Sequence, residues 1–210
     1  HLSPSLAVRC AETVTDGRLV FEYTLGEQRG TLQTRLQPGR DLRLGDAIAY
    51  VGGSGDPVGL ALEKIGVTLP RVEALEPTAL ARCKALLLGA EAHEKGFAGL
   101  PQASHLLLDF VHAGGRVAII QVQDSSYQGH FLPLPIAFSN TKGAAGAIVT
   151  PEHPLFNHPQ RIDSLQGLVS YDAIVAAAGE WEVLAKDRQG QPSILETRFG
   201  RGRVLLVQPS

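Results

Sequence analysis

Beyond residue 40, apolar residues gather in short continuous runs, and helix-like segments separate the first of these runs. Continuous runs of about four to eight apolar residues are typical of strands buried on both faces of a parallel sheet, because no position then faces water. The pattern predicts strands over 46–51, 85–88, 116–121, 147–150, 171–177, 181–186, 193–199 and 203–208, and helices over 57–65, 80–84 and 104–113.

The boundaries of two predicted helices carry residues that favour helix ends. Asp56 and Pro57 match an N-cap followed by proline in the first helical position, and Gly66 matches a C-terminal glycine. The segment SHLLLDFVHA ends at Gly114 and Gly115, which lead directly into the run RVAIIQ. Both segments therefore read as helices placed beside buried strands.

The order of these elements predicts the architecture. Strands that alternate with helices over residues 41–210 indicate an α/β domain, and we expect a three-layer, flavodoxin-like and mostly parallel sheet that ends in an antiparallel hairpin across Gly190. Residues 1–40 differ, because LAVRCAETV, RLVFEYTL and TLQTRL predict an antiparallel meander. Three short strands leave open edges, so we expect this appendage to belong to a β-sandwich or to dock on the α/β domain.

Composition excludes some classes of partner. The chain has 19 basic and 21 acidic residues with no long run of either sign, so we predict neither nucleic-acid nor membrane binding. Arg198, Arg201 and Arg203 form the one basic concentration, which we interpret as a solvated hairpin turn. Cys10 and Cys83 lie in separate predicted elements, so buried free thiols are favoured over a disulfide.

The turn after 116–121 is the place where an α/β enzyme would present a nucleophile. It reads VQDSSYQG, which contains no cysteine and no G-x-S-x-G frame. Asp124, Ser125, Ser126 and Tyr127 are the candidate catalytic residues there, with His153 or Glu91 as residues that would face them. A solvated turn is the favoured interpretation, and a hydrolase acting on a small sugar or amide is the alternative.

A glycine-rich loop, VGGSGDPVG, follows the first buried strand. Gly53, Gly55 and Gly59 have a spacing similar to that of dinucleotide sites, and the loop Gly52–Gly59 is the candidate ligand-binding segment. Asp56 places a carboxylate where a pyrophosphate would need bare amides. We therefore favour a helix cap and predict no cofactor.

Two groups of histidines have spacings that a metal site could use. His105, Asp109 and His112 share one face of a predicted helix, and Leu106, Leu107, Phe110 and Val111 take the other, as in an ordinary surface helix. His153 and His158 lie in a proline-rich loop that we interpret as a packing element. We predict no metal site.

Several sequence segments, taken together, resemble those of a known fold family. The order of elements, with DPVGLALEKIGV, KALLLGAEA, LLDFVHAGGRVAIIQ, TPEHPLFN and ILETRFGRGRVLLVQPS, is similar to the class I glutamine-amidotransferase-like fold. It most resembles the non-catalytic versions embedded in bacterial glycoside hydrolases, such as the trimerisation domain of certain β-galactosidases. The resemblance covers residues 46–208, about three quarters of the chain.

The resemblance also says what is missing. A true amidotransferase carries a cysteine elbow where this chain has Gln121 and Val122, and a His-x-Glu pair where it reads Pro209 and Ser210. Without thiolate and histidine there is no activated nucleophile. The resemblance implies a non-catalytic accessory or oligomerisation module of a larger, exported bacterial carbohydrate-active protein. Its partners would be other domains of the same polypeptide or further copies of the chain.

Overall fold

The computed structural model describes residues 6–10, 18–25, 28–35, 47–52, 55–90, 92, 103–122, 131–158, 161–170 and 172–209. The chain divides into two compact units, His1–Arg43 and Leu44–Ser210. The hydrophobic pattern changes character at residue 40.

The first unit contains a three-stranded sheet in the order β1-β2-β3. Strand β1 (Leu6–Cys10) pairs with β2 (Arg18–Leu25), which pairs with β3 (Gln28–Arg35), and both pairings are antiparallel. The predicted meander is therefore confirmed. The surface on which it packs stays a prediction.

The second unit is built on an eight-stranded sheet in the order β4-β5-β6-β13-β12-β11-β8-β9. A separate two-stranded sheet pairs β7 with β10 in antiparallel fashion. The strands are β4 (Ile48–Val51), β5 (Ala85–Leu88), β6 (Arg116–Ile120), β7 (Ile136–Ser139), β8 (Gly143–Ile148), β9 (Val169–Ser170), β10 (Ala173–Ala177), β11 (Glu182–Asp187), β12 (Pro192–Phe199) and β13 (Gly202–Val207), and the helices are α1 (Pro57–Lys64), α2 (Pro77–Leu80), α3 (Ser104–His112) and α4 (Pro154–Asn157).

The main sheet is mixed, which corrects the expectation of a mostly parallel sheet. The pairings β4-β5, β5-β6 and β6-β13 are parallel, whereas β13-β12, β12-β11, β11-β8 and β8-β9 are antiparallel. The first three parallel strands also follow one another without the reversal of a flavodoxin-like 2-1-3-4-5 order. The fold class is therefore mixed α/β, and the three-layer arrangement stays a prediction.

Most predicted elements lie where the sequence places them, and the exceptions have local causes. The helix expected over 80–84 is wrong beyond Leu80, because α2 ends at that residue and begins at Pro77, a residue that favours the first turn of a helix. The strand expected over 147–150 is β8, whose sequence GAAGAI has too few large apolar residues to mark a strand. The short elements β7, β9 and α4 were not predicted.

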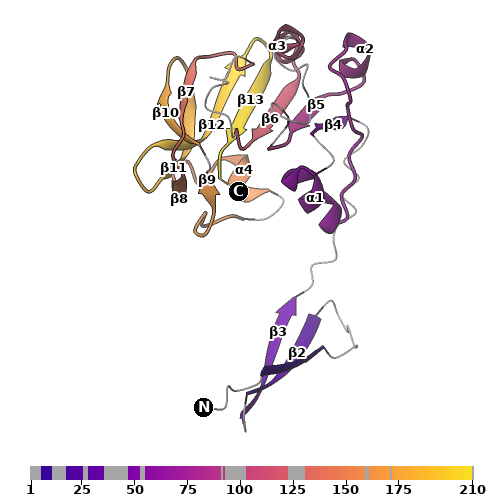
Figure 1. The fold of residues 1–210 in the computed structure, drawn as a ribbon, viewed down its shortest axis with the longest axis vertical. Helices are drawn as coiled ribbons and strands as arrows, with labels where there is room; N and C mark the ends of the chain where they lie inside the picture. The colour runs from indigo at the N-terminus through magenta and orange to yellow at the C-terminus, as the bar shows by residue number, and fades with distance from the viewer. Residues whose placement is uncertain are drawn as a thin grey trace. The chain divides into compact units, whose positions relative to one another are not determined.

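Helix α3 packs beside β6 and β13, as Figure 1 shows. Its buried residues Leu107 and Val111 join Val117, Ile119 and Leu206 in the larger of two hydrophobic clusters. A smaller cluster surrounds Phe156 of α4, which is 1% exposed, and includes Leu184 and Ile194. Each cluster buries the apolar runs that the sequence shows, which is the main stabilising contribution to such a domain.

The ends of α1 and α3 follow the expected chemistry. The Asp56 side chain accepts a hydrogen bond from the Val58 amide at 2.9 Å, so the predicted N-cap is confirmed. At the end of α3, Gly114 has a φ of +114°. A Cβ on Gly115 would meet the Phe110 ring, with Cδ1 at 2.5 Å. The two glycines therefore allow the chain to leave α3 and enter β6 beneath the Phe110 ring.

Candidate functional site

The parallel strands β4, β5, β6 and β13 end at one edge of the sheet, where ligands bind in many open α/β folds. The residues that follow them are Gly52, Gly89, Gln121 and Gln208. This carboxyl edge is the first place to look for chemistry, because it brings together segments that are far apart in the sequence.

Gln121 stands at the elbow position after β6. Its φ is +55°, and it is the one non-glycine residue in the described part of the chain with a positive φ. Such a conformation is uncommon for residues with a Cβ and is costly unless the surroundings hold it. The Gln121 amide donates to the Val207 carbonyl at 2.6 Å, and the residue is 2% exposed. A positive φ directly after the strand is thus found at a residue with an amide side chain, which carries no nucleophilic oxygen or sulfur.

The Gln208 side chain, which follows β13, is hydrogen-bonded to the segment that follows the neighbouring strand β6. Its Oε1 accepts from the Val122 amide at 2.8 Å, while its Nε2 donates to the Val122 carbonyl at 3.2 Å and to the Asp172 carbonyl at 2.5 Å. The residue is fully buried. Its side chain therefore satisfies three backbone groups that would otherwise lose water without gaining a partner.

Sequence reasoning missed this role of Gln208. The residue stood at the end of a predicted strand, and nothing in a local pattern signals a partner 86 residues away. A polar residue that closes a continuous apolar run was the available signal.

The glycine-rich loop is shaped by Tyr50. A Cβ on Gly52 would lie 2.5 Å from Tyr50 Cζ, and one on Gly59 would lie 3.2 Å from the hydroxyl oxygen. A Cβ on Gly89 would meet both the Tyr50 hydroxyl and the Asp56 carboxylate. These glycines therefore make room for a buried phenol. Burial, and then the neighbouring Asp56 carboxylate, raise the pKa of Tyr50 well above its ordinary value.

The other two glycines of the candidate dinucleotide motif are not shaped by Tyr50 in the part of the chain that the structure describes. A Cβ on Gly55 would have no neighbour within 4 Å, and Gly53 lies outside the described residues. Asp56 is 1% exposed and caps α1, so the helix N-terminus already holds a carboxylate.

The candidate catalytic turn lies outside the described residues, since Asp124, Ser125, Ser126 and Tyr127 fall there together with Glu91. His153, the described member of that group, is placed at the start of α4.

The Nδ1 atom of His153 accepts from the Leu155 amide at 3.2 Å, so the imidazole caps α4. Its Nε2 lies 3.6 Å from Glu196 Oε2, and the same oxygen accepts from Arg203 at 2.6 Å. His153 therefore joins the α4 loop to strands β12 and β13. The ion pair between Arg203 and Glu196 also corrects the interpretation of Arg203 as part of a solvated turn, because it holds the Arg203 guanidinium on the sheet.

The surface histidines are not gathered into a site. His105, Asp109 and His112 are all exposed on α3, and the His112 ring packs edge-on against Phe199 with ring centroids 5.5 Å apart. Within the described ranges, no group of three or more potential ligands could hold a metal ion. None of the helices described is long and apolar enough to cross a membrane.

Comparison with known proteins gives a likeness of fold. No family model and no curated protein matches the chain. A β-galactosidase from Rahnella sp. R3 has a TM-score of 0.52 and 12% identity, over 78% of this chain and 28% of that enzyme. An exo-β-1,4-mannosidase from Opitutaceae bacterium strain TAV5 has a TM-score of 0.50 and 13% identity, over 77% of this chain and 30% of that enzyme.

A third solved structure, described as part of a putative GMP synthase from Thermoplasma acidophilum, has a TM-score of 0.49 and 13% identity, over 77% of this chain and 82% of that protein. The chain thus spans less than a third of each of the two glycosidases. At these identities the likeness to them is one of fold alone.

Proposed function

We propose that this chain is a non-catalytic accessory or oligomerisation module of a larger carbohydrate-active protein. The proposal rests on the elbow after β6, where Gln121 occupies the bend with φ +55° and Gln208 fastens the adjacent Val122 by two hydrogen bonds. In a catalytic site the residue at this position would have to approach a substrate carbonyl. Here it is buried and hydrogen-bonded to the backbone of a neighbouring strand.

The likeness to parts of two glycosidases supports the proposal that the larger protein is carbohydrate-active. In each case the matched region makes up 28% or 30% of the enzyme, as an accessory module would. On this proposal the partners are other domains of the same polypeptide or further copies of the chain, and the protein is exported. Fold likeness alone does not transmit an activity, so the proposal assigns none to this module.

The proposal is tested on the full-length polypeptide that contains this chain. Deleting residues 44–210 should lower the mass of the assembly measured by light scattering, and should leave the kcat of a glycoside-cleaving site in another domain within about twofold. A full-length product that has no carbohydrate-active domain, or a deletion that abolishes kcat while the assembly mass is unchanged, would contradict it.

A further inference from the structure

The two ring nitrogens of His153 make two different contacts. Nδ1 accepts from the Leu155 amide at 3.2 Å, and this bond caps α4. Nε2 lies 3.6 Å from Glu196 Oε2 on β12. A ring nitrogen that accepts a hydrogen bond carries no proton, so the neutral ring holds its proton on Nε2, which faces the carboxylate. The two contacts together fix the tautomer of the ring.

A protonated ring can keep only one of these contacts. The imidazolium carries a proton on both nitrogens and has no acceptor left. Its Nδ1–H would face the N–H of Leu155, so the cap would be lost, whereas its Nε2–H would gain a charged partner in Glu196. The His153 side chain is 16% exposed, so its ring is accessible to water. Because histidine changes charge between about pH 5 and 8, both contacts respond to mild acid, in opposite directions.

The bond that acid removes belongs to the α4 loop, residues 150–157, which places Phe156 in the smaller hydrophobic cluster. Phe156 is 1% exposed, and its ring lies edge-on to the His153 ring with centroids 6.4 Å apart. The Asn157 side chain also holds this loop, since its Nδ2 donates to the Pro151 carbonyl at 2.6 Å and to the His153 carbonyl at 3.1 Å. These amide bonds do not titrate. We therefore expect acid to loosen the first turn of α4 while Phe156 stays in its cluster.

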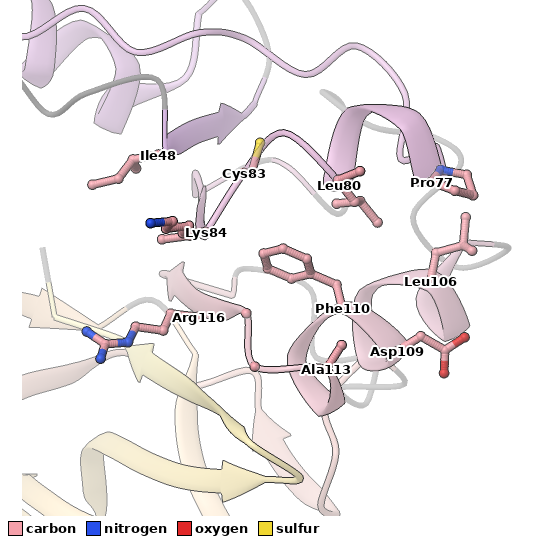
Figure 2. Close-up of a pocket in the computed structure, with 14 residues that line it drawn as sticks. Ile48, Pro77, Leu80, Cys83, Lys84, Leu106, Asp109, Phe110, Ala113 and Arg116 are labelled. Carbon is pink, nitrogen blue, oxygen red and sulfur yellow. The ribbon is translucent and has the colours of Figure 1, made fainter.

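The charged groups that face His153 from the sheet are Glu196 of β12 and Arg203 of β13. Arg203 lies 2.6 Å from the same carboxylate oxygen that faces the imidazole. Arg203 is also in register with Arg116 of β6 and Arg198 of β12, and residues in register share one face of the sheet. Figure 2 shows the Arg116 side chain pointing away from α3, so this row lies on the opposite face. The carboxylate favours a charged imidazole, and the arginines disfavour it.

The other elements that pack around α4 through the smaller cluster are β8 and β11. Strand β8, GAAGAI, has no charged residue. On β11, Asp187 accepts from two backbone amides of its own turn, and Glu182 and Lys186 are exposed. Glu152 and His158 stand at the two ends of the α4 segment and are exposed as well. Glu196 and Arg203 are therefore the charges that act on His153 at short range.

We propose that His153 is a pH-sensitive cap of α4. With a neutral ring, Nδ1 caps the helix; with a protonated ring, the cap opens and the imidazolium pairs with Glu196 beside Arg203. The sign follows from the contacts: the cap needs an unprotonated Nδ1, so it is present at high pH and lost as the pH falls. The inference concerns the face of the sheet that carries α4 and does not depend on the function proposed above.

The test is an NMR titration of the whole chain between pH 8 and pH 5, which follows the His153 ring and the Leu155 amide. We expect both signals to shift with one common midpoint. Hydrogen exchange at the Leu155 amide, corrected for the intrinsic rate at each pH, should show its protection falling roughly fivefold over this range, the loss of one side-chain cap.

Three variants separate the cap from general effects of acid. Asparagine is a good N-cap that does not titrate, so His153→Asn should leave the Leu155 amide without a pH transition. Glu196→Gln removes the carboxylate but keeps Arg203, so the shared midpoint should move to lower pH. His158→Asn, the control at the other end of α4, should leave the midpoint unchanged.

The wild-type titration alone can overturn the proposal, so it does not depend on any variant being folded. A His153 ring that stays neutral down to pH 5 would do so, as would a Leu155 amide that keeps its shift and its protection while the ring titrates. The same Leu155 transition in His153→Asn, or a midpoint that Glu196→Gln leaves unchanged or raises, would overturn it as well.

Discussion

Replacing Gly202 by alanine should destabilise the α/β unit by about 3 kcal/mol or more, because overpacking against backbone cannot be relieved by a side-chain rotation. A Cβ at this position would overlap the carbonyl oxygens of Val111 and Gly115. The backbone at Gly202 lies against the end of α3. Beside it, the Arg201 amide donates to the His112 carbonyl at 3.1 Å and so joins the β12–β13 hairpin to that helix. The free energy of unfolding in urea measures the effect.

Gly55→Ala is the matched control, since a Cβ there would have no neighbour within 4 Å. It should change the free energy of unfolding by less than about 0.5 kcal/mol. If Gly202→Ala and Gly55→Ala unfold at the same urea concentration, the hairpin does not pack on α3 as described.

Gln208→Ala should cost about 3 kcal/mol of folding free energy. The change leaves the Val122 amide, the Val122 carbonyl and the Asp172 carbonyl without the partner that the side chain supplies, and each unsatisfied buried group costs about 1 kcal/mol or more. Urea unfolding gives the total loss. Hydrogen exchange at the Val122 amide reports the local part, and we expect that amide to exchange faster.

Gln166→Ala serves as the control for Gln208→Ala, because the Gln166 side chain is exposed. It should leave both the unfolding midpoint and the exchange at Val122 unchanged. A Gln208→Ala protein as stable as Gln166→Ala would mean that Gln208 does not hold the strand ends together.

The sequence predicted the elements of the parallel half of the sheet well because their signals are local. The runs that became β5, β6 and β13 are continuous and apolar, and residues that favour helix ends, Asp56 and Gly114, stand beside α1 and α3. The hairpin of β11 and β12 was predicted from the turn at Gly190, whose φ is +83°.

The order and direction of the strands were harder to predict from the sequence. A continuous apolar run is the same whether its neighbour is parallel or antiparallel, so the mixed sheet could not be read from periodicity. The strand β8 was placed too late in the chain because alanine and glycine give it little apolar contrast.

The candidate site shows the same limit. Asp56 was recognised as a cap from its neighbour Pro57, which is a local signal. The packing role of Gly59 was not recognised from the sequence, because it depends on the space that the Tyr50 ring occupies in the fold. The Glu196 contact of His153 joins residues on separate elements, and the sequence pattern carries no information about it.

The proposed function is that of a non-catalytic module, and hydrolysis by the purified chain tests it most directly. Ammonia release from glutamine and nitrophenol release from nitrophenyl glycosides should both equal the buffer blank, because Gln121 offers no nucleophile at the elbow. The same assays are run on Asp124→Ala and Ser125→Ala, which should also give blank rates. A rate above the blank that disappears in either variant would contradict the claim and establish a hydrolase in its place.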